Sequence, residues 1–302
     1  MVFPGQGSQA VGMLQGYAGL PGIASVRDQA AQVLGAEFVR LLDEGPAEQL
    51  GLTVNTQPAM VTAGYAAYRA WRELGGAQPE LVAGHSLGEY TALVAAGALA
   101  FEDCLPLVRF RAQAMQEAVP EGEGAMAAIL SLDDGEVIAA CEEADGEVQA
   151  VNFNAPGQVV IAGEKHAVSR AIERCKARGA RRAMPLPVSA PFHSTLMRPA
   201  AQKLGGYLDK VPFTSPGISL INNVAVAVVD EPAKIKDALV RQAAAPVRWV
   251  ETIRTMRDMG VTHVIECGPG KVLAGLTRRI APDIQSLALA DRSSLEEALK
   301  AL

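Results

Sequence analysis

Two kinds of hydrophobic pattern alternate along the chain. Short runs of apolar residues, typical of buried strands, are separated by longer segments in which apolar residues recur every three or four positions, as in amphipathic helices. The strand-like runs cover residues 81–83, 218–224, 261–266 and 284–289, and the helical segments cover 57–74, 89–98, 102–119, 197–210 and 271–280. This alternation predicts an α/β fold built around a mainly parallel sheet.

The pattern changes after Pro120–Gly124, a turn-forming sequence of proline, glycine and glutamate. The next segment contains a strand at 125–132, a helix at 134–143, strands at 148–153 and 159–161, a helix at 166–178 and a strand at 181–188. The order β-α-β-β-α-β is that of ferredoxin-like domains. We therefore expect a ferredoxin-like small domain at 123–190, inserted into a large α/β domain that is formed by 1–122 and 191–302.

Charge and hydropathy narrow the function classes. The 302 residues include 27 basic and 33 acidic side chains, which give a formal net charge of −6. This balance disfavours nucleic-acid binding, which usually needs a basic surface. The longest apolar stretches are interrupted by charged residues or glycine, and the first residues lack the features of a signal peptide. We expect a cytoplasmic protein with neither a membrane nor a nucleic-acid partner.

Four cysteines, Cys104, Cys141, Cys175 and Cys267, lie far apart in the sequence. No pair has the C-x-x-C spacing of metal or redox sites. We expect free, buried thiols in a reducing compartment, and no metal site.

The first candidate for chemistry is Gly84–Gly88, which reads Gly-His-Ser-Leu-Gly. It fits the G-x-S-x-G nucleophile elbow, in which two glycines allow a sharp turn from strand to helix and expose the serine hydroxyl. An apolar strand precedes it and a helical pattern follows, as the elbow requires. The pattern therefore indicates Ser86 as a nucleophile; the alternative is a glycine-rich turn that caps a helix.

A nucleophilic serine needs a base, and the chain has four histidines. His85 adjoins Ser86 on a sharp turn, His166 begins a helix of the insert, and His263 lies in a strand. His193 follows the insert in an irregular loop, where catalytic groups are often found, and is therefore the leading candidate. No Asp or Glu between Ser86 and His193 stands out at a strand end of the large domain. We expect a dyad whose imidazole is oriented by a backbone carbonyl.

An oxyanion hole needs two N–H donors. One is the N–H of Leu87, the residue after the nucleophile. A second donor is expected from Gly5–Gly7, although this segment is equally compatible with a simple connecting turn. Arg109 and Arg111 flank the apolar stripe of the helix at 102–119, and periodicity does not decide which of them would bind a carboxylate.

Together these residues resemble the malonyl-CoA:acyl carrier protein transacylases and, more broadly, the acyltransferase domains of polyketide and fatty acid synthases. The shared motifs are FPGQGSQ at 3–9, GHSLGE at 84–89, RAQAMQ at 111–116, NFNAPGQ at 152–158, FH at 192–193, NNV at 222–224 and ECGPGK at 266–271. The resemblance covers essentially the whole chain, and the order and spacing of the motifs are very specific.

The resemblance implies a hydrolase-like large domain with the ferredoxin-like insert. It also implies ping-pong transfer of malonyl from malonyl-CoA to acyl carrier protein through a malonyl ester, without a metal or redox cofactor. The implied roles are nucleophile for Ser86, base for His193, backbone oxyanion donors for Gln6 and Leu87, carboxylate binding for Arg111 and a His-orienting carbonyl near Gln242. Phe192, just before the histidine, implies a preference for malonyl over methylmalonyl groups.

Two rival interpretations stay open. A serine hydrolase or thioesterase would need an acid in the triad, and a carrier-binding scaffold would not need Ser86, His193 and Arg111 together. For an acidic carrier protein, the chain offers two basic clusters as docking surfaces, with the alternative that both are ordinary solvated faces. The first consists of Arg170, Arg174, Lys176, Arg178, Arg181 and Arg182, and the second of Lys271, Arg278 and Arg279. A monomer is expected.

Overall fold

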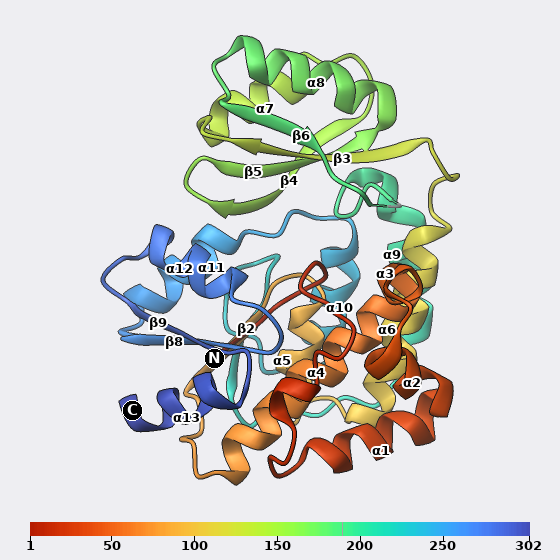
Figure 1. The fold of residues 1–302 in the computed structure, drawn as a ribbon. Helices are drawn as coiled ribbons and strands as arrows, with labels where there is room; N and C mark the ends of the chain where they lie inside the picture. Colours follow the sequence, from red (N-terminus) through yellow and green to blue (C-terminus); the bar gives the residue numbers. More distant parts are fainter. Residues whose placement is uncertain (189) are drawn as a thin grey trace.

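The computed structural model describes residues 1–302 except residue 189, and places them in two domains, one above the other in Figure 1. The larger domain contains a five-stranded sheet in the order β7-β2-β1-β8-β9, and every neighbouring pair is parallel. Its strands are β1 (Val2–Phe3), β2 (Leu81–Gly84), β7 (Ser219–Ile221), β8 (His263–Cys267) and β9 (Gln285–Leu289). The predicted α/β fold with a mainly parallel sheet is confirmed.

Helices cover both faces of this sheet. Successive residues of a strand point to opposite faces, so Val2 packs on the side of α11 (Trp249–Asp258) and α12 (Val272–Ile280), whereas Phe3 packs on the side of α4 (Thr53–Glu73). The remaining helices of this domain are α1 (Ile23–Leu34), α2 (Ala36–Glu44), α3 (Ala47–Gly51), α5 (Gly88–Ala95), α6 (Phe101–Gln116), α9 (Arg198–Leu208), α10 (Pro232–Ala243), α13 (Arg292–Ala301) and the 3₁₀ turns Gln15–Tyr17 and Thr195–Met197.

The smaller domain contains an antiparallel sheet in the order β4-β5-β3-β6. Its elements are β3 (Gly124–Leu130), α7 (Asp134–Glu142), β4 (Val148–Ala155), β5 (Gln158–Glu164), α8 (Lys165–Ala177) and β6 (Arg182–Pro185). Element order and strand order are those of a ferredoxin-like domain, as expected. The boundaries at 123–190 stay a prediction.

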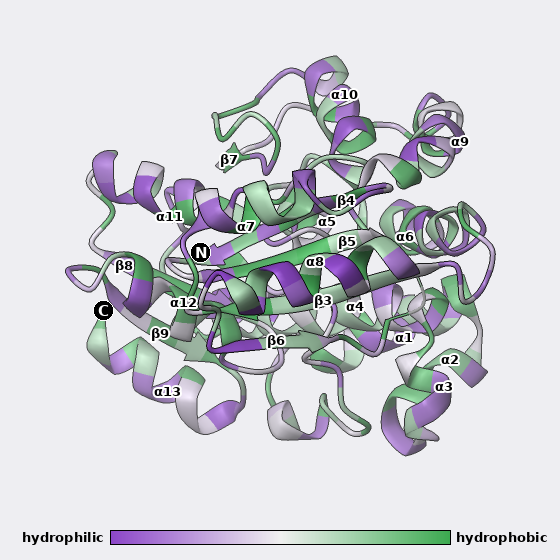
Figure 2. Ribbon diagram, turned by 90° about the horizontal axis from the view of Figure 1, so that it is seen from above, coloured by the Kyte–Doolittle hydropathy of each residue, from purple (hydrophilic) through white to green (hydrophobic). Residues whose placement is uncertain are grey.

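The two faces of the small sheet pack against different parts of the molecule. Figure 2 looks down on this domain and shows α7 and α8 lying over the strands. Ala127 and Ile129 of β3 pack in the cluster beneath these helices, whereas Met126 belongs to a cluster on the opposite face, together with Val160 of β5. This opposite face turns toward the large domain, so the alternation along β3 brings one apolar side chain to the domain boundary.

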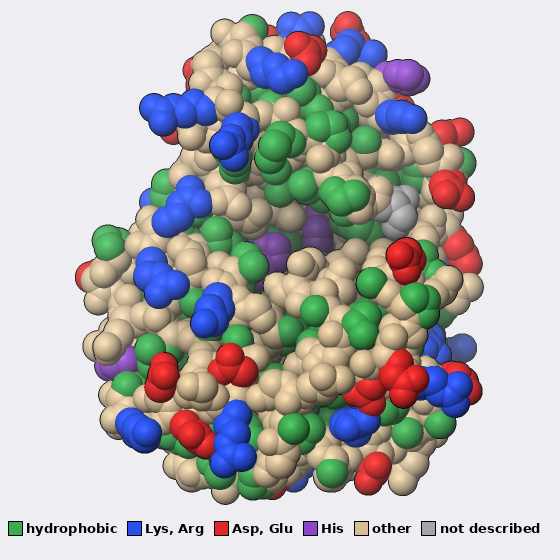
Figure 3. Space-filling view, viewed as in Figure 1, with side chains coloured by type: hydrophobic (Ala, Val, Ile, Leu, Met, Phe, Trp, Pro, Cys, Tyr) green, Lys and Arg blue, Asp and Glu red, His purple; other side chains and the backbone are tan. Residues whose placement is uncertain are grey.

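Backbone hydrogen bonds join the two domains next to β4. The N–H of Phe153 donates to the carbonyl of Val247 at 3.0 Å, and the N–H of Val247 donates to the carbonyl of Val151 at 2.8 Å. Between the domains the surface is hollowed, and histidine side chains are visible inside the hollow (Figure 3). Among the described residues, no helix is both long and apolar enough to cross a membrane. All four cysteines are free and buried.

Candidate active site

The hollow leads to a sharp turn between β2 and α5. Ser86 sits at this turn with a φ of 52°, a left-handed conformation that costs energy for a residue with a side chain. A Cβ added to Gly84 would lie 1.8 Å from the carbonyl carbon of Gly88, and one added to Gly88 would lie 2.0 Å from the carbonyl oxygen of Phe3. Both glycines are therefore required by close backbone approach, as in a nucleophile elbow.

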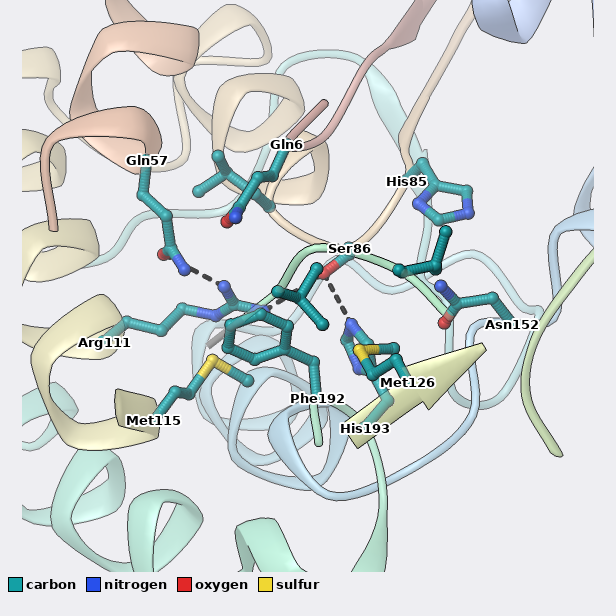
Figure 4. Close-up of a pocket in the computed structure, with 13 residues that line it drawn as sticks. Gln6, Gln57, His85, Ser86, Arg111, Met115, Met126, Asn152, Phe192 and His193 are labelled. Atoms are coloured by element: carbon teal, nitrogen blue, oxygen red, sulfur yellow. Dashed lines mark hydrogen bonds between the residues drawn. The ribbon is translucent and has the colours of Figure 1, made fainter. Parts of the chain in front are cut away.

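The hydroxyl of Ser86 faces the imidazole of His193 (Figure 4). Oγ of Ser86 lies 2.7 Å from Nε2 of His193, and Nδ1 of the same ring lies 2.9 Å from the backbone carbonyl of Gln242. A carbonyl only accepts, so Nδ1 carries the proton and donates it to this bond. The lone pair of Nε2 then points at the serine hydroxyl, which is the arrangement of a base poised to take its proton.

His193 is 4% exposed. Burial, together with the nearby positive charge of Arg111, lowers the pKa of its imidazole to about 3. The ring is therefore neutral at neutral pH, the only form in which Nε2 can accept a proton.

The other histidines lie outside this pair. Nε2 of His85 lies 2.8 Å from Oδ1 of Asn154, and its ring packs 5.5 Å from that of Trp249. His166 belongs to α8 on the outside of the small domain, and His263 begins β8.

A cavity of about 150 Å³ opens beside Ser86 and His193. Gln6 and Leu87 line it, and within the described part of the chain neither backbone N–H donates a hydrogen bond. The loop that carries Gln6 approaches closely because Gly5 has no side chain: a Cβ there would lie 2.7 Å from the carbonyl oxygen of His85. Two unused donors thus border the cavity next to the nucleophile.

One arginine enters the cavity from α6. Arg111 is 2% exposed, and its guanidinium carbon lies 5.3 Å from the ring centre of Tyr90. Its Nη2 donates to Oγ of Ser86 at 3.3 Å, so the cation borders the nucleophile. Arg109 points elsewhere, with its guanidinium 5.7 Å from the ring centre of Phe38. The structure thus separates two arginines that periodicity left equivalent.

The side chain of Gln242 is a part of the site that the sequence did not reveal. Its Oε1 accepts from Nη2 of Arg111 at 3.0 Å, while its Nε2 donates to the backbone carbonyl of Ser86 at 3.1 Å and to Oε2 of Glu89 at 2.9 Å. Gln57 of α4 accepts from Nη1 of Arg111 at 3.0 Å. The sequence offered one signal for this network: Gln57 is a polar residue in a helical segment of mainly small and apolar residues.

Asn223, two residues after the end of β7, holds the backbone of the elbow through its side-chain amide. Its Oδ1 accepts from the N–H of Ser86 at 2.7 Å, and its Nδ2 donates to the carbonyl of Gly84 at 2.7 Å. The N–H of Ser86 is thereby occupied, which leaves the N–H of Leu87 as the free donor of the turn.

Apolar side chains form the remaining wall of the cavity. Met115 comes from α6, Met126 from β3, and Leu186, Val188 and Phe192 from the segment that leads from the small domain back to His193. Figure 4 shows Phe192 and Met126 among the side chains around Ser86 and His193. The wall limits the size of an acyl group on Ser86. Within the described residues, no group of three or more His, Cys, Asp or Glu side chains is arranged to hold a metal ion.

Comparison with known proteins places this geometry in a family context. Residues 1–291 match the family model described as "Acyl transferase domain". The chain is 52% identical over 302 residues to the malonyl CoA-acyl carrier protein transacylase of Escherichia coli K12, with 99% of this chain and 98% of that protein covered.

Solved structures of malonyltransferases are also similar to this chain. The crystal structure of acyl-carrier-protein S-malonyltransferase from Burkholderia pseudomallei 1710b is 62% identical, with a TM-score of 0.97 and coverage of 99% and 98% of the two chains. A type II PKS acyl-carrier protein in complex with its malonyl-transacylase is 48% identical, with a TM-score of 0.98 and coverage of 100% and 99%.

Proposed function

The chain belongs to the family of malonyl-CoA:acyl carrier protein transacylases, and on that premise we propose that Ser86 and His193 carry out its malonyl transfer to the carrier protein. The observation that carries the proposal is the chain of two hydrogen bonds from Oγ of Ser86 through the His193 ring to the carbonyl of Gln242. A neutral, oriented imidazole next to a hydroxyl on a strained turn is the arrangement of an activated nucleophile.

In the first half-reaction, Nε2 of His193 takes the proton of Ser86 as Oγ attacks the thioester carbon of malonyl-CoA. The carbonyl oxygen becomes an oxyanion, and the free N–H groups of Gln6 and Leu87 stabilise it. When the tetrahedral intermediate collapses, the C–S bond breaks. The coenzyme A thiolate leaves with the proton from the imidazolium, and a malonyl ester remains on Ser86.

The second half-reaction uses the same groups with a different thiol. Neutral His193 takes the proton of the phosphopantetheine thiol, and the thiolate attacks the ester carbon. The C–O bond then breaks, and Oγ of Ser86 regains the proton from the imidazolium. Both steps are acyl transfers between sulfur and oxygen, so atoms and charge balance without an external cofactor.

Arg111 suits the carboxylate of the malonyl group for two reasons. In a malonyl ester the carboxyl carbon is three bonds from Oγ, and Nη2 of Arg111 is already 3.3 Å from that oxygen. Moreover, no carboxylate among the described residues forms an ion pair with this buried cation. A buried unpaired charge is unfavourable, so a substrate carboxylate that pairs with it removes part of that penalty.

The rival hydrolase function finds less support. A backbone carbonyl, not a carboxylate, orients His193, so the acid of a hydrolase triad is replaced by the peptide group of Gln242. The apolar wall beside Ser86 disfavours an ordered water near the ester, which would preserve it until the second thiol arrives.

We also propose that an acidic carrier protein docks at the rim of the hollow. In the first basic cluster, Arg174 and Arg178 form ion pairs with Glu143, and Lys176 forms one with Glu173. These ion pairs weaken the electrostatic attraction of the three cations for an acidic partner. No ion pair among the described residues includes Arg181 or Arg182, nor Lys271 or Arg278 of the second cluster. These four cations therefore form the docking surface that we favour. Basic side chains gather along one side of the hollow in Figure 3.

We further propose that the protein is a monomer and acts in the cytoplasm, a reducing compartment in which its four buried free thiols stay reduced.

Two substitutions test the proposed roles. Ser86→Ala should abolish both covalent labelling by malonyl-CoA and transfer to the carrier protein, because no other hydroxyl side chain among the described residues lines the cavity. His193→Ala should slow acylation by about 10²–10⁴-fold, the usual contribution of a general base. Transfer at a near-normal rate by either variant would exclude the dyad.

A further inference from the structure

Glu89 is a buried carboxylate next to the active site that the mechanism above does not use. It lies in α5, three residues after the nucleophile, and is 1% exposed. It does not line the cavity beside Ser86, and it forms no ion pair with any described residue. Placing a carboxylate there is costly, so its contacts need an explanation.

Those contacts lead to the catalytic groups. Oε2 of Glu89 accepts from Nε2 of Gln242 at 2.9 Å and from the backbone N–H of Asn223 at 3.0 Å. Gln242 in turn contacts Arg111 and His193, and Asn223 contacts the N–H of Ser86. One oxygen thus links α5 to the two segments, far away in the sequence, that hold the guanidinium, the imidazole and the elbow.

The orientation of the Gln242 amide depends on what its two ends face. Its NH₂ group meets only acceptors, the carbonyl of Ser86 and the carboxylate of Glu89, so its Oε1 is directed at Arg111. A flipped amide would bring N–H groups against the guanidinium, which has only donors. The negative charge of Glu89 favours the observed orientation over the flipped one more strongly than a neutral acceptor would.

Opposing effects act on the ionisation of the Glu89 carboxyl group. Burial raises the pKa of Glu89 to about 7, and the two hydrogen bonds and the charge of Arg111 oppose this rise. The structure shows no direct hydrogen bond between Arg111 and Glu89; Nη2 of Arg111 donates to Oε1 of Gln242 at 3.0 Å and to Oγ of Ser86 at 3.3 Å.

We propose that Glu89 is a positioning residue that holds Gln242 so that Arg111 is aligned for a carboxylate-bearing acyl group, and thereby sets the preference for malonyl over acetyl groups. The inference rests on the function proposed above for Ser86 and Arg111. It predicts that the loss of Glu89 affects substrates unequally: malonyl-CoA needs the aligned guanidinium, whereas acetyl-CoA, which has no carboxylate, does not.

The experiment compares Ser86 acylation by malonyl-CoA and by acetyl-CoA in Glu89→Met and Glu89→Gln. Methionine fills the space but is only a weak and uncharged hydrogen-bond acceptor. The malonyl-to-acetyl ratio of kcat/KM should therefore fall about 10-fold, the effect of weakening one charge-assisted hydrogen bond. Glutamine offers an amide oxygen to both donors and should restore the ratio to within about 3-fold of the parent.

Glu266→Met is the matched control, because Glu266 is also fully buried but has no hydrogen bond to a described active-site residue. Its Oε2 accepts from the N–H of Ala274 at 2.8 Å. It should leave the ratio unchanged even if stability falls. An equal loss for both substrates in Glu89→Met, or a ratio that falls as far in Glu266→Met, would show a merely structural role and overturn the proposal.

A further variant covers the case in which Glu89→Met does not fold. Gln242→Met removes the amide but keeps the backbone carbonyl that His193 needs, and the ratio must fall by a similar factor; an unchanged ratio overturns the proposal. Failure of the underlying function has a different signature. There, Arg111→Ala itself would leave the malonyl-to-acetyl ratio unchanged.

Discussion

Replacing Arg111 by alanine tests how the site recognises its acyl group. The substitution removes a buried guanidinium that lies 3.3 Å from Oγ of Ser86 and leaves the base and the elbow in place. It also leaves Oε1 of Gln57 and Oε1 of Gln242 without their donor. The space left by the side chain joins the cavity of about 150 Å³ that Arg111 and Gln57 line, so water can replace the lost donor, and we expect the variant to fold.

The expected effect follows from the hydrogen bonds to the substrate carboxylate. A hydrogen bond to a charged group contributes about 1.5–3 kcal/mol, so kcat/KM for malonyl-CoA should fall about 10- to 150-fold. Acetyl-CoA has no carboxylate and should lose little. The malonyl-to-acetyl ratio should therefore fall by about the same 10- to 150-fold. Arg111→Lys should recover only part of it, because lysine keeps the charge but lacks the planar pair of donors.

The assay is the release of free coenzyme A thiol during acylation, measured for both substrates on parent and variants. Arg109→Ala is the matched control, since Arg109 lies on the same helix with its guanidinium over Phe38. It should change the ratio by no more than about 2-fold. An unchanged ratio in Arg111→Ala, or an equal fall in Arg109→Ala, would refute the assignment.

Three further predictions concern selectivity, pH and docking. The parent should prefer malonyl-CoA to methylmalonyl-CoA, and Phe192→Ala should narrow that preference about 10-fold by relieving the overpacking of a methyl group; comparable kcat/KM values of the parent for the two substrates would refute this. Since the pKa of His193 is lowered from 6.5 to about 3, the unfolded chain binds a proton in this window that the folded chain does not, so stability falls as the pH falls. Between pH 6.5 and about 5 the parent should lose about 1.6 kcal/mol more of its free energy of unfolding than His193→Ala does, as measured by urea unfolding, and parallel curves would contradict the buried neutral ring. Charge reversal at Arg181 and Arg182 should raise the KM for the carrier protein, as should added salt in the parent, without slowing acylation by malonyl-CoA. If the KM for the carrier protein is unchanged by charge reversal at Arg181 and Arg182 and also by reversal at Lys271 and Arg278, docking at these positions is excluded.

The sequence predicted the parts of the fold whose hydrophobic period is strong. The buried strands of the parallel sheet and the β-α-β-β-α-β order of the insert were located to within a few residues. Helices α1 to α3, α10, α11 and α13 were not predicted, although α2 and α11 bury apolar residues at helical spacing. Their positions depend on packing against the rest of the domain, which no local pattern records.

Within the site, local sequence patterns located only the residues whose backbone makes a sharp turn, such as Ser86 in the elbow. The elbow is recognisable because it needs its two glycines: a Cβ on either of them would lie about 2 Å from neighbouring backbone atoms. The choice between Arg109 and Arg111 depends on the rotation of α6 relative to Ser86, which is set by tertiary packing. The side-chain network of Gln242, Glu89 and Asn223 joins α10, α5 and the end of β7, so it exists only after folding.

Mass spectrometry can show directly whether Ser86 carries the malonyl group between the two thiols. The protein would be incubated with malonyl-CoA, analysed intact and as peptides, and then mixed with carrier protein that bears its phosphopantetheine. We expect one malonyl adduct on the peptide that contains Ser86, stable in buffer and lost when the malonyl mass appears on the carrier protein. An adduct on another residue, or rapid release of free malonate without a carrier protein, would contradict this role of Ser86.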